Sequence, residues 1–148
     1  MMDVFKILIS LFLIYSIVAF LLGMKHKKNP YGLSRYFLPI GAFVWVDTVI
    51  FGLFFTLVSF FCLVLNQTLL FFIVYSVFWL VRSVGEQIYW FLEQFTTQHR
   101  NPPHTLWPKK WFKGEESWIV MQVTWQCVTV VFAVLSIYLF FVWFKTLV

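Results

Sequence analysis

Long apolar stretches, separated by short polar segments, dominate the chain. Four stretches are long enough to be membrane spans, at about residues 5–24, 37–65, 68–92 and 117–144. About 20 apolar residues in an α-helix cross the roughly 30 Å of hydrocarbon in a bilayer. Strands fit the pattern less well, because the strands of a membrane barrel are shorter and alternate apolar with polar residues. The pattern predicts an all-α integral membrane protein with four transmembrane helices.

Composition favours the same class. Of the 148 residues, 61% are hydrophobic and 11% are charged, whereas an average soluble domain has roughly 25% charged residues. These values exclude a disordered chain, a coiled coil, a collagen and a disulfide-stapled secreted module. The first stretch is too long for the apolar region of a signal peptide, and no A-x-A-like site precedes Met24, so we expect it to remain as a span. In this interpretation residues 1–148 form a single polytopic membrane domain.

Basic residues gather in two of the polar segments. The first link, at residues 25–36, and the second link, at residues 96–116, together contain Lys25, Lys27, Lys28, Arg35, Arg100, Lys109, Lys110 and Lys113. The opposite ends of the spans carry Lys6 and Lys145. Lys and Arg are enriched in cytoplasmic loops of membrane proteins. We therefore expect an antiparallel bundle in a cell membrane or an organelle inner membrane, with both links cytoplasmic and with both termini and the uncharged turn at residues 66–68 external.

The two halves of the chain share one organisation. Each half has a span, a basic link with an Asn-Pro pair, and a second span; the pairs are Asn29-Pro30 and Asn101-Pro102. Proline lacks a backbone N–H and disfavours helix at the preceding residue, so both links are expected to be turns with defined ends. Pro39 is expected in the first turn of the second span, where a missing donor costs nothing.

A cluster of aromatic and basic residues lies in the second link. It comprises Trp107, Lys109, Lys110, Trp111 and Lys113. Indole rings prefer the membrane interface, and lysine ammonium groups attract lipid phosphates. The cluster predicts an interfacial anchor for anionic headgroups, with a merely solvated basic loop as the alternative. The net charge of +5 has the same explanation, because the basic residues flank apolar spans and do not form a nucleic-acid-binding domain.

Three charged residues, Asp47, Arg82 and Glu86, lie inside the predicted spans. A charge at the centre of a transmembrane helix costs about 2.5 to 3.5 kcal/mol on insertion scales, so such groups usually face protein or water. Arg82 and Glu86 are four residues apart and should meet on one helix face. Asp47 and Glu86 are equally far from the turn at residues 66–68, so an antiparallel pair of helices would place them at one level.

Polar residues of two further helix faces extend this group. Tyr89 and Glu93 continue the face of Arg82 and Glu86, and Glu93 is expected to be solvated near the cytoplasmic headgroups. In the fourth span, Gln122, Gln126 and Thr129 form a stripe, and Gln126 should lie roughly 13 Å inward from Ser117 at helical rise. The sequence therefore predicts a polar layer of Asp47, Arg82, Glu86, Gln122 and Gln126.

The predicted layer has three interpretations. Ion pairs and amide hydrogen bonds between helices could simply fix the packing. Alternatively, two carboxylates share one guanidinium, so one of them could bind a proton or a cation and serve transport. Docking of a partner subunit or of a lipid headgroup is the third.

Other chemistry has little support in the sequence. His26, His99 and His104 lie in the links and match no metal-ligand or haem spacing, so no metal and no cofactor is expected. Cys62 and Cys127 are expected to be free and apolar core residues. Serines occur singly on apolar helices, where they usually bond a backbone carbonyl. A histidine of the second link beside Glu93 and Arg100 is the one arrangement that could act on a lipid substrate at the membrane surface.

Four helices alone enclose little room for a substrate path. We therefore expect an accessory or structural subunit that works in a homo-oligomer or with a partner membrane subunit. The alternative is a small transporter or channel for protons, cations or a small solute that uses Asp47, Arg82 and Glu86. A membrane-surface enzyme that modifies lipids is the third hypothesis.

Overall fold

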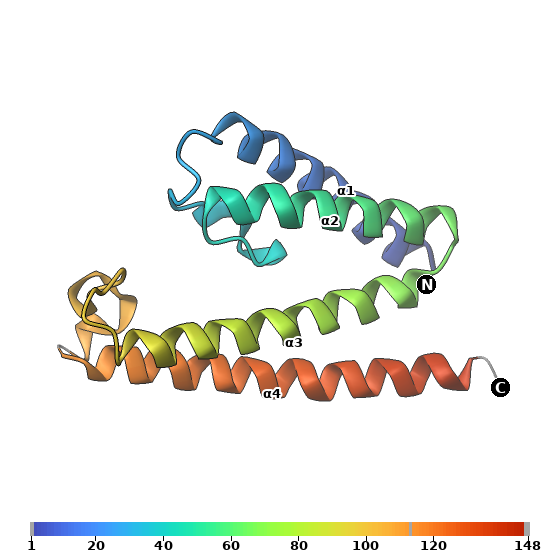
Figure 1. Ribbon diagram of the computed structural model, residues 1–148. Helices are drawn as coiled ribbons and strands as arrows, with labels where there is room; N and C mark the ends of the chain where they lie inside the picture. Colours follow the sequence, from blue (N-terminus) through green and yellow to red (C-terminus); the bar gives the residue numbers. More distant parts are fainter. Residues whose placement is uncertain (1, 113, 147–148) are drawn as a thin grey trace. The chain divides into compact units, whose positions relative to one another are not determined.

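The computed structural model describes residues 2–112 and 114–146, and this part of the chain contains helices and turns but no β-strand. The four α-helices are α1 (Met2–Lys25), α2 (Trp45–Val64), α3 (Thr68–Glu93) and α4 (Glu116–Lys145) (Figure 1). Short 3-10 helices occupy the links: η1 (Arg35–Ile40), η2 (Pro103–Thr105) and η3 (Trp107–Lys110). Each α-helix is long and apolar enough to cross a membrane. The predictions of an all-helical chain and of four helices long and apolar enough to be spans are confirmed.

The chain divides into two compact units, unit 1 at residues 1–74 and unit 2 at residues 75–148. The boundary falls inside α3, so the first two turns of this helix belong with α1 and α2. Ile9, Cys62 and Phe71 form a buried cluster in unit 1, and the ring of Phe12 lies edge-on to those of Phe55 and Phe71 at 5.3 and 5.4 Å between centroids.

Two glycines let α1 and α2 approach closely. A Cβ atom added to Gly52 would lie 2.7 Å from the backbone nitrogen of Phe20, and one added to Gly23 would lie 2.9 Å from the backbone nitrogen of Val49. Small residues at such contacts allow the backbone of one transmembrane helix to reach that of another. Both contacts pair late residues of α1 with early residues of α2, close to the link that joins these two helices.

The second span begins later than predicted. The α-helix starts at Trp45, whereas the apolar stretch starts at about residue 37, and Pro39 lies in η1 and not in α2. Gly41 ends η1 in the left-handed conformation, with φ 73°, which turns the chain back. Phe37, Ile40 and Ala42 are buried. These residues are apolar because their side chains are buried within unit 1, and not because they extend the helix.

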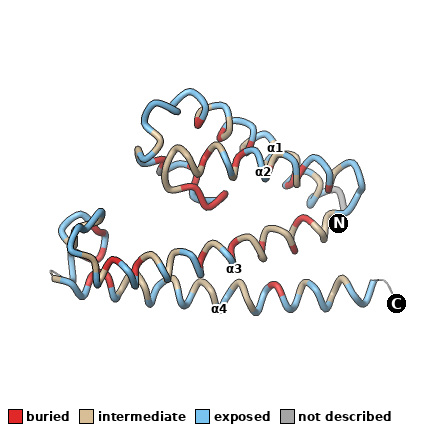
Figure 2. The backbone as a smooth tube through the Cα atoms, viewed as in Figure 1, coloured by how far each residue is buried: buried red, intermediate tan, exposed pale blue. Residues whose placement is uncertain are grey.

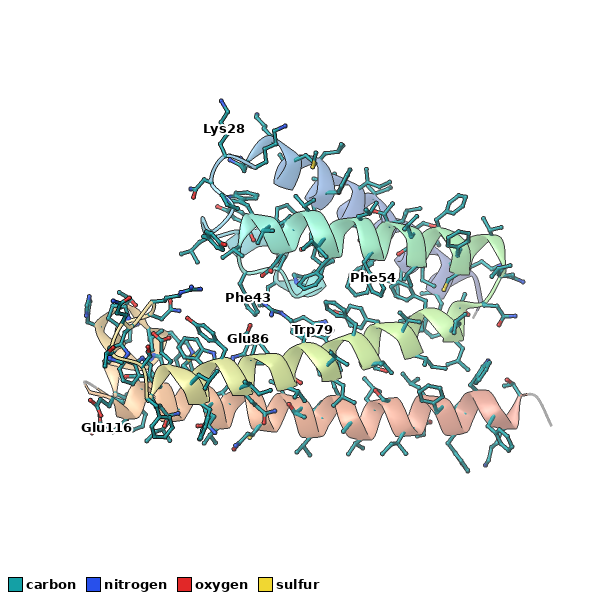
Figure 3. All side chains as sticks on the ribbon, in the orientation of Figure 1. Lys28, Phe43, Phe54, Trp79, Glu86 and Glu116 are labelled. Atoms are coloured by element: carbon teal, nitrogen blue, oxygen red, sulfur yellow. The ribbon has the colours of Figure 1, made fainter. Side chains whose placement is uncertain are left out.

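Unit 2 is a hairpin of α3 and α4. The indole of Trp79, which Figure 3 labels on α3, stacks on Trp125 and Phe132 of α4, with ring centroids 6.4 and 5.6 Å apart. Ser136 of α4 donates a buried hydrogen bond to Ser76 of α3, with 3.1 Å between the two oxygens. Most positions of α4 are exposed or half-buried in the single chain (Figure 2).

Candidate functional site

Polar side chains join α3 to α4 at three levels along unit 2. At the first level Ser136 bonds Ser76. At the second, the Thr129 hydroxyl accepts a hydrogen bond from the Gln87 amide and lies 2.8 Å from the Ser83 hydroxyl. At the third, the amide of Gln94, the residue that directly follows α3, donates to Gln122 Oε1 at 2.7 Å. We call these residues the α3–α4 ladder: Ser76, Ser83, Gln87, Gln94, Gln122, Thr129 and Ser136.

The ladder contains one of the two predicted glutamines of α4 and excludes the other. Gln122 faces α3, whereas Gln126 is exposed and forms no hydrogen bond among the described residues. The predicted stripe of Gln122, Gln126 and Thr129 is therefore split. At 100° per residue Gln126 lies 60° from Thr129, which is enough to turn its amide away from α3.

Most of the ladder was missed by sequence reasoning, although the spacing carried a signal. Gln122, Thr129 and Ser136 are seven residues apart, and the same interval separates Ser76 from Ser83 and Gln87 from Gln94. A seven-residue repeat is the period at which two packed helices bring the same face together. A serine taken alone on an apolar helix indicates only a bond to a backbone carbonyl, whereas the seven-residue spacing of these polar residues indicates an interhelical contact.

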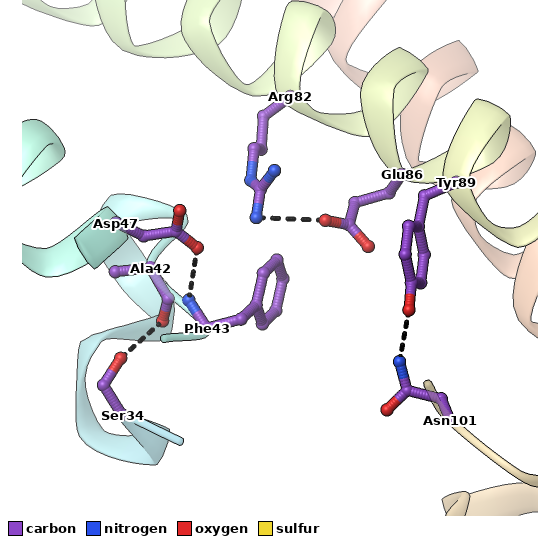
Figure 4. A network of polar contacts seen from close by, with 8 residues as sticks. All are labelled: Ser34, Ala42, Phe43, Asp47, Arg82, Glu86, Tyr89 and Asn101. Atoms are coloured by element: carbon purple, nitrogen blue, oxygen red, sulfur yellow. Dashed lines mark hydrogen bonds and ion pairs between the residues drawn. The ribbon is translucent and has the colours of Figure 1, made fainter. Parts of the chain in front are cut away.

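The predicted pair on α3 is present. Arg82 Nη2 lies 3.0 Å from Glu86 Oε1, and the two side chains are 21% and 13% exposed (Figure 4). A spacing of four residues stacks the two side chains on one helix face. The pair neutralises both charges within one helix.

Asp47 belongs to unit 1, where it lies in the first turn of α2. Its Oδ2 accepts a hydrogen bond from the backbone N–H of Phe43 at 3.2 Å (Figure 4). A carboxylate in this position compensates the free N–H groups and the positive end of the helix dipole. Asp47 therefore helps to start α2. An interaction of Asp47 with Arg82 or Glu86 stays a prediction.

Glu93 is buried, so the expectation of a solvated carboxylate is wrong. Its side chain is at the end of α3 and is only 5% exposed. Glu93 Oε1 accepts the backbone N–H of Asn101 at 2.9 Å, and the Asn101 amide donates to the Tyr89 hydroxyl (Figure 4). The reason is local: the second link folds back over the end of α3 and covers the carboxylate that the end of the helix would otherwise expose.

Aromatic rings complete this folded link. Trp118 donates its indole N–H to the Asn101 carbonyl at 2.9 Å, and the ring of His99 lies 4.2 Å from that of Trp118. Trp90, Leu106 and Trp118 form a buried cluster beneath. His99 Nδ1 lies 3.1 Å from the backbone oxygen of Glu93, not from its carboxylate. These contacts give His99 and Glu93 packing roles.

The predicted interfacial anchor presents its indoles outward. Trp107 and Trp111 are 54% and 69% exposed, and their rings meet edge-on with centroids 5.8 Å apart. Pro108 between them is buried, which fixes η3 to the rest of unit 2. Lys110 is exposed. The side chain of Lys109 and the whole of Lys113 lie outside the described part of the structure.

The first link carries exposed aromatics as well, which sequence reasoning missed. Tyr31 and Tyr36 are 78% and 85% exposed, in the same link as Lys25, Lys27 and Lys28. The backbone oxygen of Tyr36 accepts a hydrogen bond from Tyr15 of α1 at 2.8 Å, which ties the link to that helix. Each unit thus places exposed rings and basic residues together in its own link.

The cysteines and acidic groups offer no metal site among the residues described. No group of three or more His, Cys, Asp or Glu side chains there could hold an ion. Cys62 and Cys127 are both free thiols. Cys62 is buried as expected, but Cys127 is exposed, so the expectation that it is a core residue is wrong.

Comparison of the chain with known protein families, with curated proteins and with solved structures found no match.

Proposed function

We propose that this chain is a small multi-pass membrane protein that acts as an accessory or structural subunit of an oligomer or of a larger membrane complex. The α3–α4 ladder is the observation that supports this proposal best. Its polar side chains hydrogen-bond to one another between two apolar helices, which is the pattern of groups that fix helix packing. Groups that bind a transported solute must instead exchange their partners.

The native assembly tests this proposal. Membranes that contain the tagged chain are solubilised directly into polymer-bounded lipid discs, and the particles are sized and their polypeptides quantified. We expect each particle to hold this 17.7 kDa chain together with at least one further polypeptide, identical or different, in a fixed ratio. Stable particles with one copy of the chain and no other protein would contradict the proposal.

The proposed topology is an antiparallel four-helix bundle with both links cytoplasmic and both termini external. It is supported by eight Lys and Arg residues in the links against Lys6 and Lys145 at the other ends of the spans. Single cysteines in place of Lys27, Lys110 and Gln67 test it in a background without native cysteines. An impermeant maleimide should label position 67 from outside and the other two only after the membrane is opened. Labelling of position 67 from the cytoplasm would overturn the orientation.

A proton or cation pathway is the second candidate function. The observation that favours it is the Arg82–Glu86 pair, which lies well inside α3 and is largely shielded. Glu86→Gln removes the charge and keeps the shape. A conducting site predicts that proton or cation flux into liposomes is lost while the fold survives; a structural pair predicts a change in stability alone. Glu115→Gln, at an exposed position just before α4, is the matched control.

A further inference from the structure

Gln126 carries the exposed side-chain amide among the described residues of the four α-helices. It lies ten residues after the start of α4, about 15 Å along the helix. Among the described side chains, those exposed on α1 before Lys25, on α2 and on α3 are apolar apart from Gly85. On α4, the hydroxyl of exposed Thr124 is satisfied by the backbone oxygen of Val120 at 2.7 Å. The amide of Gln126 has no hydrogen bond in the described chain.

Lipid tails cannot satisfy this amide. An unpaired amide in hydrocarbon costs several kcal/mol, and Gln126 lies inside the apolar stretch of residues 117–144 that the proposed topology places in the bilayer. The exposed surfaces of α1, α2 and α3 carry no such group, so lipid suffices to cover them. The amide marks α4 as the helix whose exposed side requires a polar partner.

An exposed apolar stripe runs along the same side of α4. Its residues follow a spacing of four and three: Val123, Cys127, Val130, Val134, Ile137, Phe141 and Phe144. Together with Gln126 they lie within an arc of about 100° at 100° per residue. Alternating steps of four and three are the spacing at which two helices pack side chains between each other. We call these seven residues and Gln126 the α4 stripe.

We propose that the α4 stripe pairs with the α4 stripe of a second copy of this chain, and that the two Gln126 amides hydrogen-bond across the pair. This inference rests on the proposed function and names the partner. Copies inserted with one topology are related by an axis along the membrane normal. Two α4 helices then run parallel and in register, so each residue near the axis faces itself.

Two features of α4 suit such self-pairing. An amide both donates and accepts, so two copies of Gln126 satisfy each other. In addition, α4 has no charged residue between Glu116 and Lys145. A pair of α4 helices therefore brings no charged side chains together inside the span.

Cys127 makes the pairing measurable with the native sequence. Intact membranes are treated with a short bifunctional maleimide or a mild oxidant, and the chain is sized under denaturing conditions. We expect a species of twice the 17.7 kDa protomer. Cys127→Ser should abolish it, and Cys62→Ser, which removes the buried thiol, should leave it unchanged.

Single cysteines along α4 then define the face. In a background that lacks both native thiols, cysteines at Val123, Val130 and Val134 should cross-link efficiently. Cysteines at Val131 and Leu135, which are also exposed but lie outside the arc, are the matched controls. Equal cross-linking at stripe and control positions would mean random collision in the membrane and would overturn the proposal.

Gln126→Leu tests the amide separately from the stripe. The substitution places an apolar side chain on an exposed apolar surface, so the chain should still fold, and the cross-linked fraction should fall threefold to tenfold when measured at Val130→Cys. Thr124→Val is the control and should have no effect. If no dimer forms while the chain still purifies in a larger particle, the partner is another protein; this inference fails and the proposed function stands. Particles with one chain alone would contradict both.

Discussion

Glu93 is a charged residue whose environment comes from the chain that follows it. Its carboxylate is 5% exposed and accepts the backbone N–H of Asn101. Glu93→Ala should destabilise the folded second link by about 1 to 3 kcal/mol, because a buried N–H loses its acceptor. Glu93→Gln keeps an oxygen at the same place and should cost less. Hydrogen exchange of the amide of Asn101 measures both effects.

The exposed Glu115 provides the control for this experiment, since its replacement by Gln should leave the exchange at Asn101 unchanged. Equal protection of Asn101 in the wild type and in Glu93→Ala would show that the carboxylate does not hold the link.

At the scale of single residues, sequence reasoning succeeded where a contact depends on one helix. The spacing of Arg82 and Glu86 is enough to bring their side chains together, and they lie 3.0 Å apart. The expectations for Glu93 and Cys127 were wrong because the burial of both side chains depends on which residues a link or a neighbouring helix brings near. Helical periodicity gives the direction of a side chain but not what lies in that direction.

At the scale of the element, the α3–α4 ladder joins two mostly apolar helices by hydrogen bonds between their side chains. Thr129 contributes most to it, because its hydroxyl contacts both Gln87 and Ser83. Thr129→Val should lower the stability of unit 2 by about 0.6 to 1.7 kcal/mol, from the average to the maximum measured for single hydrogen bonds between transmembrane helices. Reversible unfolding in mixed micelles measures this change.

Thr124→Val is the matched control for the ladder. Thr124 lies on the same helix, is exposed, and bonds only the carbonyl of its own helix at Val120. It should change the stability by a few tenths of a kcal/mol at most. Equal effects of the two substitutions would mean that the ladder contributes no interhelical stability.

The short helix η3 is the element on which the proposed lipid contact depends. If the predicted anchor is present, its exposed indoles lie at the headgroup level and the neighbouring lysines attract anionic lipid. Replacing Lys109, Lys110 and Lys113 by Gln should weaken the association with anionic lipid by about 1 kcal/mol per charge. Quenching of tryptophan by brominated phosphatidylserine, compared with brominated phosphatidylcholine, gives the preference. An unchanged preference in the triple variant would leave the second link merely solvated.

The start of α2 shows where an apolar pattern misleads at this scale. Residues 37–44 are apolar enough to extend the span, yet they form the end of η1 and a turn. Their buried side chains pack inside unit 1. High hydropathy indicates that a side chain avoids water, but it does not distinguish burial in lipid from burial in protein. Only the left-handed Gly41 and the bridge between Leu33 and Val44 separate the two cases, and both are backbone features that composition does not encode.

At the scale of the whole molecule, the number and class of the spans could be predicted from the sequence because lipid imposes them directly. About 20 apolar residues with internally bonded backbone suffice, whatever packs around them. How the helices pair depends instead on small residues and on polar contacts between distant positions. Gly52 against Phe20 and Ser76 with Ser136 are examples that no local pattern identifies.

The predicted layer of Asp47, Arg82 and Glu86 would join unit 1 to unit 2, and a double-mutant cycle tests it. Arg82→Gln leaves Glu86 without its cation, and if Asp47 lies nearby, two carboxylates are stranded, so the chain should lose stability. Asp47→Asn keeps an oxygen for the N–H of Phe43 and removes the charge. It should therefore partly rescue Arg82→Gln, with a coupling energy above about 0.5 kcal/mol.

The cycle is read from reversible unfolding in mixed micelles, with Glu86→Gln as the second partner of Arg82. Coupling between Arg82 and Glu86 is expected in any case, because their atoms lie 3.0 Å apart within α3. It calibrates the size of a real contact in this chain. If Asp47 and Arg82 prove additive within about 0.3 kcal/mol while Arg82 and Glu86 couple, the two units do not share the layer. Asp47 would then act only at the start of α2, and Arg82 and Glu86 would be a local pair of α3.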